Sequence, residues 1–291
     1  MATPRPSTVV SPGRHRFLSG LADLGMNFAV AIGGIFMILP FVWMVSASFK
    51  TTTEIFRPAT LLPSSFNLNN YLDLFTRWPF AQWFTNSLIV AGATTMAVLF
   101  FCSLAGFAFS KYRFRGRKQL FFGLLGSAMI PFPILVIPLF VIVSNLGWTN
   151  SMVALIVPFM APAIGIFLMK QYMEYVPQEM LDSSRMDGAS EFRIYAQIVL
   201  PIVGPGLATL AIITFLNSWN SFLWPLVVVR REVSMTLPVG MANMLTAVSA
   251  GSARPYGPAM AAATLVCIPT VAVFLLVQRY YIAGIASGAV K

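Results

Sequence analysis

Charged side chains are scarce in this sequence. Only 10% of its 291 residues are Asp, Glu, Lys or Arg, and 57% are hydrophobic, whereas about 25% charged residues is usual in a soluble domain. A soluble fold of this length needs a charged surface that so few residues cannot supply. The shortage of charge excludes an ordinary soluble protein and favours a protein that lies in a membrane.

Nucleic-acid binding is excluded by where the basic residues fall, although the net charge is +10. A nucleic-acid-binding domain carries its Lys and Arg on one face, with a polar surface elsewhere. Here they lie in short connections between apolar runs, so we expect membrane lipid, and no nucleic acid, around the chain. The two cysteines, Cys102 and Cys267, lie inside apolar runs without metal-type spacing and are predicted to be packing residues.

The apolar runs contain no ionisable groups. The sequence also lacks motifs for binding ATP or for catalysis. All nine acids lie outside these runs or at their borders, and the single histidine, His15, lies near the start. An ion-coupled carrier usually holds ionisable groups at membrane depth, because they bind the driving ion. No phosphate loop, HExxH or nucleophile-elbow pattern is present. We therefore predict no catalytic residue, no metal site and no cofactor in this chain, so that a partner supplies the energy for uphill transport.

Long uncharged runs predict an all-α membrane protein with six spanning helices, because a span needs about 20 mostly apolar residues. A polar stretch at 144–151 divides the uncharged run from Gln119 to Met169 into two spans. The first 20 residues, rich in Pro, Ser and Arg, predict a disordered cytoplasmic lead before a transmembrane domain over 21–291. The predicted spans cover about 24–47, 86–110, 119–143, 151–170, 204–229 and 256–278.

The distribution of Lys and Arg predicts the orientation of these spans. Thirteen of the 19 lie in the N-terminal lead, the second and fourth connections, and the C-terminal tail. Basic residues are enriched in cytoplasmic connections of membrane proteins. We therefore expect both termini to be cytoplasmic, and the segments 49–85 and 230–255 to face outward, where they can contact an external protein.

The connection over 174–201 holds five of the nine acids. Pro177 is suited to a helix start and Gly188 to a helix stop, and Ser190 can cap a second short helix. Phe192, Tyr195 and Val199 recur at helical spacing and predict an apolar stripe before Pro201 ends the run. Such short helices need a surface to pack on; from the pattern alone, that surface is either the membrane or a partner protein.

Two segments carry a resemblance to a known family. Residues 185–189, Arg-Met-Asp-Gly-Ala, and 198–201, Ile-Val-Leu-Pro, resemble the EAA motif of the inner-membrane permease subunits of binding-protein-dependent ABC importers. The Glu-Ala-Ala element of that motif is replaced here by Asp-Ser-Ser at 182–184. Residues 217–226, Asn-Ser-Trp-Asn-Ser-Phe-Leu-Trp-Pro-Leu, resemble a run in sugar permeases of the maltose-transporter type, in which many members have an acid where this chain has Ser221.

The resemblance implies a multi-pass permease subunit of the bacterial inner membrane, without enzymatic activity of its own, that helps to import a carbohydrate. It also implies the partners: a second, homologous permease, two cytoplasmic ATPase subunits that hold ATP and Mg, and an external substrate-binding protein. The loop would couple transport to ATP hydrolysis. The implied ATPase-coupling residues are Asp182, Ser183, Ser184, Arg185, Asp187, Gly188, Ala189 and Phe192.

Polar and aromatic residues in the fifth predicted span are candidates for the substrate path: Asn217, Trp219, Asn220 and Trp224. Spaced three apart, the two asparagines are expected on one helical face, and Asn and Trp together offer hydrogen bonds and an aromatic surface to a sugar. The alternative is hydrogen bonding between helices and an aromatic belt at the membrane interface. A self-contained carrier or channel, and a membrane-anchored scaffold, are the alternative functions.

Overall fold

The computed structural model describes residues 12–56, 60–246 and 255–288, with side chains for 25–56, 60–246 and 255–275. All regular structure among these residues is helical, as predicted. The elements are the α-helices α1 (Pro12–Ala47), α2 (Thr52–Ile55), α3 (Asn69–Arg77), α4 (Phe80–Lys111), α5 (Arg117–Ser127), α6 (Phe132–Asn145), α7 (Met152–Ile156), α8 (Ala163–Glu174), α9 (Gln178–Met186), α10 (Glu191–Ile194), α11 (Leu200–Ile202), α12 (Gly204–Trp219), α13 (Leu223–Val228), α14 (Leu237–Thr246) and α15 (Tyr256–Gly288), the 3₁₀ helices η1 (Val157–Phe159) and η3 (Glu232–Ser234), and the π-helix η2 (Tyr195–Val199).

Three helices are long and apolar enough to cross a membrane unaided: Gly25–Ala47 within α1, all of α4, and Tyr256–Leu275 within α15. Three further candidates are bent pairs, with angles of 100° between α5 and α6, 45° between Met152–Phe159 and α8, and 80° between Glu191–Ile202 and α12. If each pair is one span, the total is up to six by length and composition. The number six stays a prediction.

Several predicted boundaries need correction. The range 119–143 is not one straight helix, because α5 ends at Ser127 and a new helix begins after Pro131, its N-terminal cap residue. The range 204–229 is interrupted between Trp219 and Leu223. Helix α1 begins at Pro12, inside the segment predicted to be disordered, while residues 1–11 lie outside the described residues.

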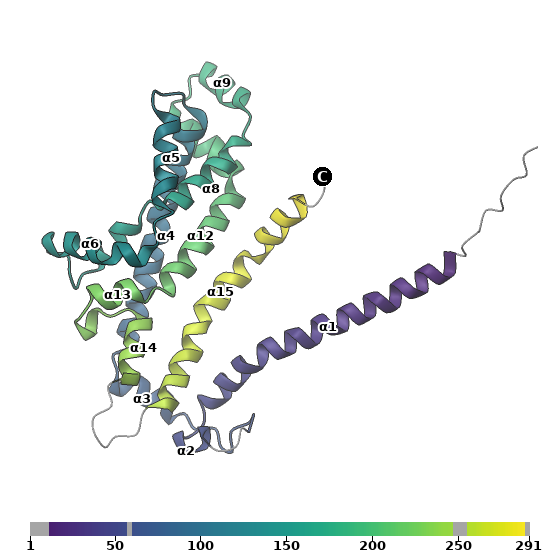
Figure 1. Ribbon diagram of the computed structural model, residues 1–291, viewed down its shortest axis with the longest axis vertical. Helices are drawn as coiled ribbons and strands as arrows, with labels where there is room; N and C mark the ends of the chain where they lie inside the picture. The colour runs from purple at the N-terminus through teal and green to yellow at the C-terminus, as the bar shows by residue number, and fades with distance from the viewer. Residues whose placement is uncertain (1–11, 57–59, 247–254, 289–291) are drawn as a thin grey trace, which may run out of the picture.

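The centre of the bundle is α4, which packs along α8 and α12 (Figure 1). Small residues allow this close approach. A Cβ placed on Gly106 of α4 would lie 2.7 Å from the Cβ of Met169 in α8. At the same contact Gly165 of α8 lies against the Cys102 sulfur. Cys102 is buried in this core, as expected of a packing residue, and Cys267 is half-buried; both are free thiols.

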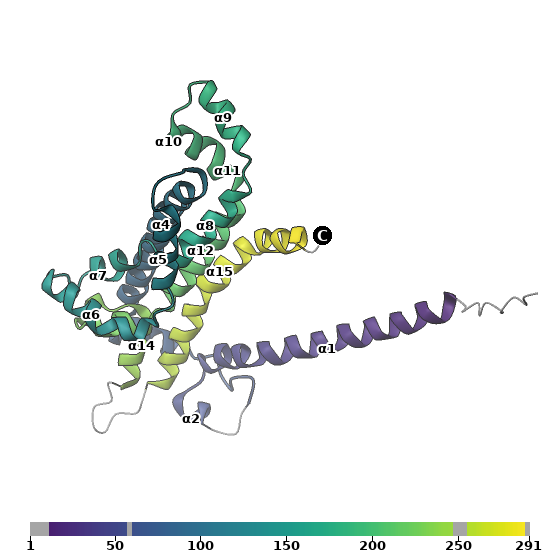
Figure 2. The same cartoon turned by 45° about the horizontal axis from the view of Figure 1, so that its top comes forward.

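Helix α1 stands apart from the bundle for most of its length and meets it near Ala47 (Figures 1 and 2). The apolar stretch within Gly25–Ala47 is not buried by any other part of the chain. Helix α15 lies between α1 and the bundle and contacts both α1 and α12. An exposed apolar surface of this length needs lipid or another protein to cover it.

Candidate functional site

Helices α9 and α10 form a projection at one end of the bundle (Figures 1 and 2). Gly188 joins them with a φ of 80°, a left-handed conformation that favours glycine. Ser190 caps α10 by accepting a hydrogen bond from the Arg193 backbone N–H at 3.3 Å. The predicted helix–glycine–helix unit is confirmed.

An ion-pair network ties the two helices together across this turn. The Arg185 guanidinium donates to both carboxylate oxygens of Glu191, at 2.7 and 3.1 Å, and to Asp182 Oδ1 at 2.7 Å. The two bonds to Glu191 form a bidentate pair, which fixes orientation as well as distance. The hydrogen bonds from Arg185, with that from Tyr112, hold the pKa of Glu191 below its usual value. Sequence reasoning missed Glu191 as part of this site.

The network also reaches the end of α4. Tyr112, which follows the last residue of α4, donates its hydroxyl to Glu191 Oε2 at 2.5 Å. Burial, and then the hydrogen bond to Glu191, raise the pKa of Tyr112 to about 12. A second link joins the Tyr195 hydroxyl to Ser103 Oγ of α4 at 2.7 Å, in a buried position. Glu191 of the projection and Tyr195, the first residue of η2 after it, are therefore both held at the C-terminal part of α4.

The predicted apolar stripe is wrong at Phe192. That side chain is 65% exposed, while Tyr195 and Val199 are buried against α4 and α8 together with Ile194. Phe192 precedes the π-helix Tyr195–Val199 and lies in α10, where Ile194 takes the buried position instead. The run also continues through Pro201 and turns at Val203 instead.

The eight predicted coupling residues lie together on this projection, and most face outward. Asp182, Ser183, Asp187, Gly188 and Phe192 are exposed, while Ser184, Arg185 and Ala189 are half-buried. Both serine hydroxyls bond back to carbonyls of α9, so they add little polarity to its surface and resemble the alanines of the motif. Met186, the last residue of α9, which sequence reasoning missed, is 88% exposed.

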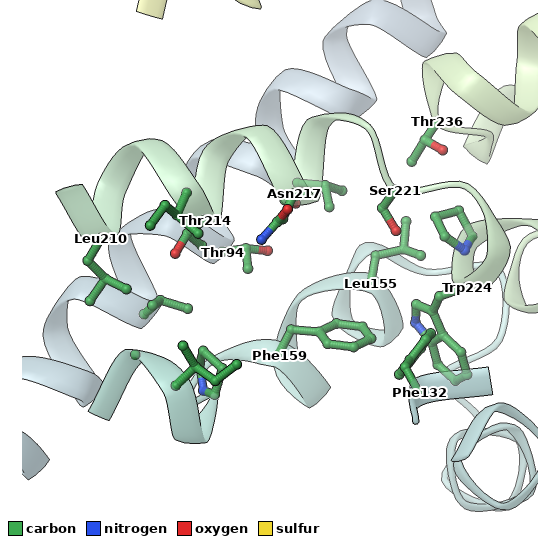
Figure 3. Close-up of a pocket in the computed structure, with 18 residues that line it drawn as sticks. Thr94, Phe132, Leu155, Phe159, Leu210, Thr214, Asn217, Ser221, Trp224 and Thr236 are labelled. Carbon is green, nitrogen blue, oxygen red and sulfur yellow. The ribbon is translucent and has the colours of Figure 1, made fainter. Parts of the chain in front are cut away.

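A second feature is a cavity of about 650 Å³ inside the bundle, within the range of about 300–1,000 Å³ usual for ligand pockets. Asn217 and Trp224 line it, as Figure 3 shows. Trp224 is fixed by a hydrogen bond of 2.9 Å from its Nε1 to the Ala154 carbonyl. The cavity is bounded by α4, by the start of α6, by the α7–η1–α8 segment, by α12 and by α13.

Trp219 and Asn220 do not belong to this cavity, so the expectation of a single Asn–Trp face is wrong. Trp219 is 1% exposed and packs between Phe84 and Phe215, at ring distances of 5.5 and 5.9 Å. Asn220 is exposed and donates its amide to the Leu216 carbonyl at 2.8 Å. The reason is that α12 ends at Trp219, so spacing by three no longer places residues on one face.

Residues that sequence reasoning missed complete the cavity wall: Thr94, Phe132, Leu155, Phe159, Thr214, Ser221 and Thr236. Thr94 and Thr95 form a polar pair in the middle of an uncharged run, which is a signal the sequence offered. The aromatic residues come from segments with no polar signature. Among the described residues, no three His, Cys, Asp or Glu side chains come close enough to hold a metal ion.

Comparison with known proteins agrees with this architecture. Residues 99–287 match the family "Binding-protein-dependent transport system inner membrane component". The chain is 38% identical over 285 residues to the arabinooligosaccharides transport system permease protein AraQ of Halalkalibacterium halodurans, covering 94% of this chain and 97% of that protein. It is 30% identical to the lactose transport system permease protein LacG of Rhizobium radiobacter, covering 93% and 97%.

The fold is shared with a solved transporter. A chain of a bacterial ABC transporter involved in the import of the acidic polysaccharide alginate superposes with a TM-score of 0.81, at 22% identity, over 96% of this chain and 100% of that one. Together, the matched residues, the relatives and the helices able to span a membrane show that this chain belongs to the inner membrane components of binding-protein-dependent transport systems, which are transport subunits of ABC importers without an ATPase site of their own.

Proposed function

We propose that this chain forms part of the path by which a carbohydrate enters the cytoplasm, driven by ATP hydrolysis on partner subunits. One observation carries the proposal: α4 belongs to both candidate features. Near its C-terminal end, α4 is hydrogen-bonded to the chain of the projection through Ser103 and through Tyr112, which follows its last residue. Its middle lines the cavity through Thr94. A displacement of α9 and α10 by a partner would therefore act directly on a wall of the cavity.

The projection supports the docking of an ATPase subunit, which would hold ATP and Mg. Asp182 keeps one carboxylate oxygen on Arg185 and is otherwise exposed, so a basic group of a partner can approach it. The exposed Met186 and Phe192 add apolar contact area on either side of the Gly188 turn. Exposed apolar residues beside a polar rim are typical of protein interfaces.

The uncovered surface of α1 supports a second permease subunit. A stretch of α1 long enough to span a membrane is not buried by this chain. An external substrate-binding protein is supported by a similar fold, with a TM-score of 0.66, in a bacterial alginate ABC transporter solved in complex with an alginate pentasaccharide-bound periplasmic protein. We propose the same kinds of partner for this chain.

A carbohydrate substrate is supported by the relatives and by the cavity. The relatives are named for arabinooligosaccharides, lactose and sn-glycerol-3-phosphate. The cavity combines hydroxyl and amide groups with aromatic rings, which suits hydrogen bonds to sugar hydroxyls and contact with sugar C–H groups. No lining residue among those described is ionisable, which argues against the alternative of an ion-coupled carrier.

Co-purification with the ATPase subunit tests the proposal. The wild-type chain should retain the ATPase in detergent, and Asp182→Lys should lose it because two like charges then meet at the contact. Glu232→Lys is the matched control, because Glu232 lies in η3, far from the projection along the chain and outside its contacts. Equal retention by all three chains would contradict docking at the projection. Uptake by the chain alone, without ATPase, would support a self-contained carrier instead.

A further inference from the structure

The cavity has two chemically different sides. Figure 3 shows Asn217, Thr94 and Thr214 on one side of the cavity. The rings of Phe159, Phe132 and Trp224 lie across the cavity from them. The rings contact one another edge-to-face, at 5.7 Å between Phe132 and Phe159 and 6.0 Å between Phe159 and Trp224. The ligand that fits such a wall has hydrogen-bonding groups on one side and an apolar face on the other.

Two threonine hydroxyls at this cavity have no hydrogen-bond partner. Thr94 and Thr236 are each 4% exposed, and neither Oγ1 atom is bonded to any group of the described chain. Buried hydroxyls are nearly always paired, because an unpaired one loses its bonds to water without replacement. The adjacent Thr95 follows this rule and donates to the Ala91 carbonyl at 2.7 Å. Thr94 and Thr236 therefore each place an unused hydrogen-bonding group in the cavity wall.

The described residues that line the cavity are all uncharged. None of the 18 described residues that line the cavity is Asp, Glu, Lys, Arg or His. A carboxylate or phosphate that entered would lose its hydration without gaining a cation, which is strongly unfavourable. Hydroxyl groups carry no such penalty, because Thr, Ser and Asn side chains can both donate and accept hydrogen bonds.

We propose that this cavity binds an uncharged oligosaccharide and excludes its phosphorylated and carboxylated counterparts, with Thr94 and Thr236 as hydrogen-bonding residues and Phe159 and Trp224 as the surface for sugar C–H groups. The proposal rests on the function proposed above and narrows its substrate class. It separates this chain from relatives named for sn-glycerol-3-phosphate and from the transporter of acidic alginate, which carry anions. It associates the chain with those named for arabinooligosaccharides and lactose.

Direct binding to the full-length chain in lipid nanodiscs tests this proposal. The probes are arabinotriose and lactose as neutral ligands, and trigalacturonate and sn-glycerol 3-phosphate as anionic ligands, read out by the shift in unfolding temperature. We expect a shift with a neutral probe and none with either anionic probe. A shift with an anionic probe at comparable concentration, or no shift with either neutral probe, would overturn the proposal.

Isosteric variants separate a ligand-binding hydroxyl from a packing residue. Thr94→Val and Thr236→Val remove an unpaired hydroxyl, so the empty chain should unfold at the same or a higher temperature. The same variants should bind the neutral probe about tenfold more weakly, the loss expected for one hydrogen bond. Thr94→Ser, which keeps the hydroxyl, and Thr95→Val, which alters a paired one, should bind like the wild type. Unchanged binding by both valine variants at the cavity would contradict the assigned role.

Failure of this proposal is distinguishable from failure of the proposed function. ATP-driven uptake of an anionic sugar by the assembled complex would overturn the charge selectivity and leave the importer function intact. Suppose instead that a neutral sugar binds the nanodisc-held chain but the complex does not take it up when ATP is supplied. That result would overturn the importer function and leave the charge selectivity of the cavity intact. The two measurements use different preparations, so neither result depends on the other.

Discussion

Arg185 and Glu191 form a bidentate ion pair across the Gly188 turn, and this pair sets how α10 is held against α9. Both side chains are partly solvent-exposed, so the pair contributes little to the free energy of unfolding, on the order of 0–1 kcal/mol. Its consequence is geometric. Glu191 also accepts from Tyr112, so the same carboxylate fixes the projection to α4.

Removing the charge of Glu191 should impair coupling without impairing folding. Glu191→Gln keeps the size of the side chain and loses the charge-assisted bonds to Arg185. We expect normal amounts of protein in the membrane and a several-fold fall in substrate-stimulated ATP hydrolysis by the assembled complex. The control is Glu179→Gln, the same change on α9 outside the ion-pair network, which should leave stimulated ATP hydrolysis unchanged. Equal activity of both variants would show that the pair is not needed.

Acid should loosen the projection. The pKa of Glu191 is lowered in the folded chain, so the ion pair stabilises the fold above the usual carboxyl value of 4.5 and is lost as the pH falls through the lowered value. A spin label at Met186→Cys, which is an exposed site, should become more mobile as the pH falls below about 4.5. With Glu191→Gln added, the label should be mobile at every pH. If the mobility of the label does not change with pH in the chain that keeps Glu191, the Arg185–Glu191 ion pair does not hold the projection.

The two asparagines should respond differently to mutation. Asn217 lines the cavity, whereas Asn220 does not and donates a hydrogen bond to the Leu216 carbonyl of its own helix. Asn217→Ala should lower ATP-driven uptake about tenfold, the loss expected for one or two hydrogen bonds to substrate. Asn220→Ala should change uptake less than twofold, by the same reasoning. A larger effect at Asn220 would show that the substrate passes elsewhere.

The orientation predicted from basic residues is testable at the turn between α4 and α5. Tyr112 and Glu191 are bonded, so this turn and the projection lie at the same end of the molecule. In a chain with Cys267 replaced by alanine, Arg115→Cys should react with a membrane-impermeant thiol reagent only after permeabilisation. Val233→Cys, 60% exposed in η3, should react in intact cells. Reversed labelling would invert the predicted topology.

Local features of this chain were predictable because they depend on neighbouring residues. The left-handed turn at Gly188 and the Ser190 cap follow from residue types and their immediate spacing. The uncharged runs indicated helices at α4 and α15 but not their full lengths, since α4 begins at Phe80 and α15 continues past Arg279 to Gly288. Orientation was inferred from the distribution of charge alone.

The remaining features depend on contacts between distant segments. Thr94, Phe159 and Trp224 meet at one cavity although they come from three different helices, and no period in the sequence links them. The end of α12 at Trp219 was missed because no Gly or Pro marks it. That early end places Trp219 and Trp224 in separate hydrophobic clusters, so one predicted group of residues became two.

The role of α9 and α10 in coupling is tested most directly at Gly188, the residue that joins them. Its φ of 80° costs a residue with a Cβ about 1–2 kcal/mol, yet a Cβ built there has no atom within 4 Å. Gly188→Val should therefore leave membrane insertion intact and change the angle between α9 and α10. Gly204→Val is the matched control, because Gly204 also has open space around it but no positive φ.

The most direct measurement is substrate-stimulated ATP hydrolysis by complexes reconstituted in lipid vesicles with each of these two variants. We predict that the Gly188→Val complex assembles in normal amount and loses stimulated hydrolysis, while the Gly204→Val complex retains it. Full stimulated hydrolysis with Gly188→Val would contradict the claim that α9 and α10 couple this chain to an ATPase.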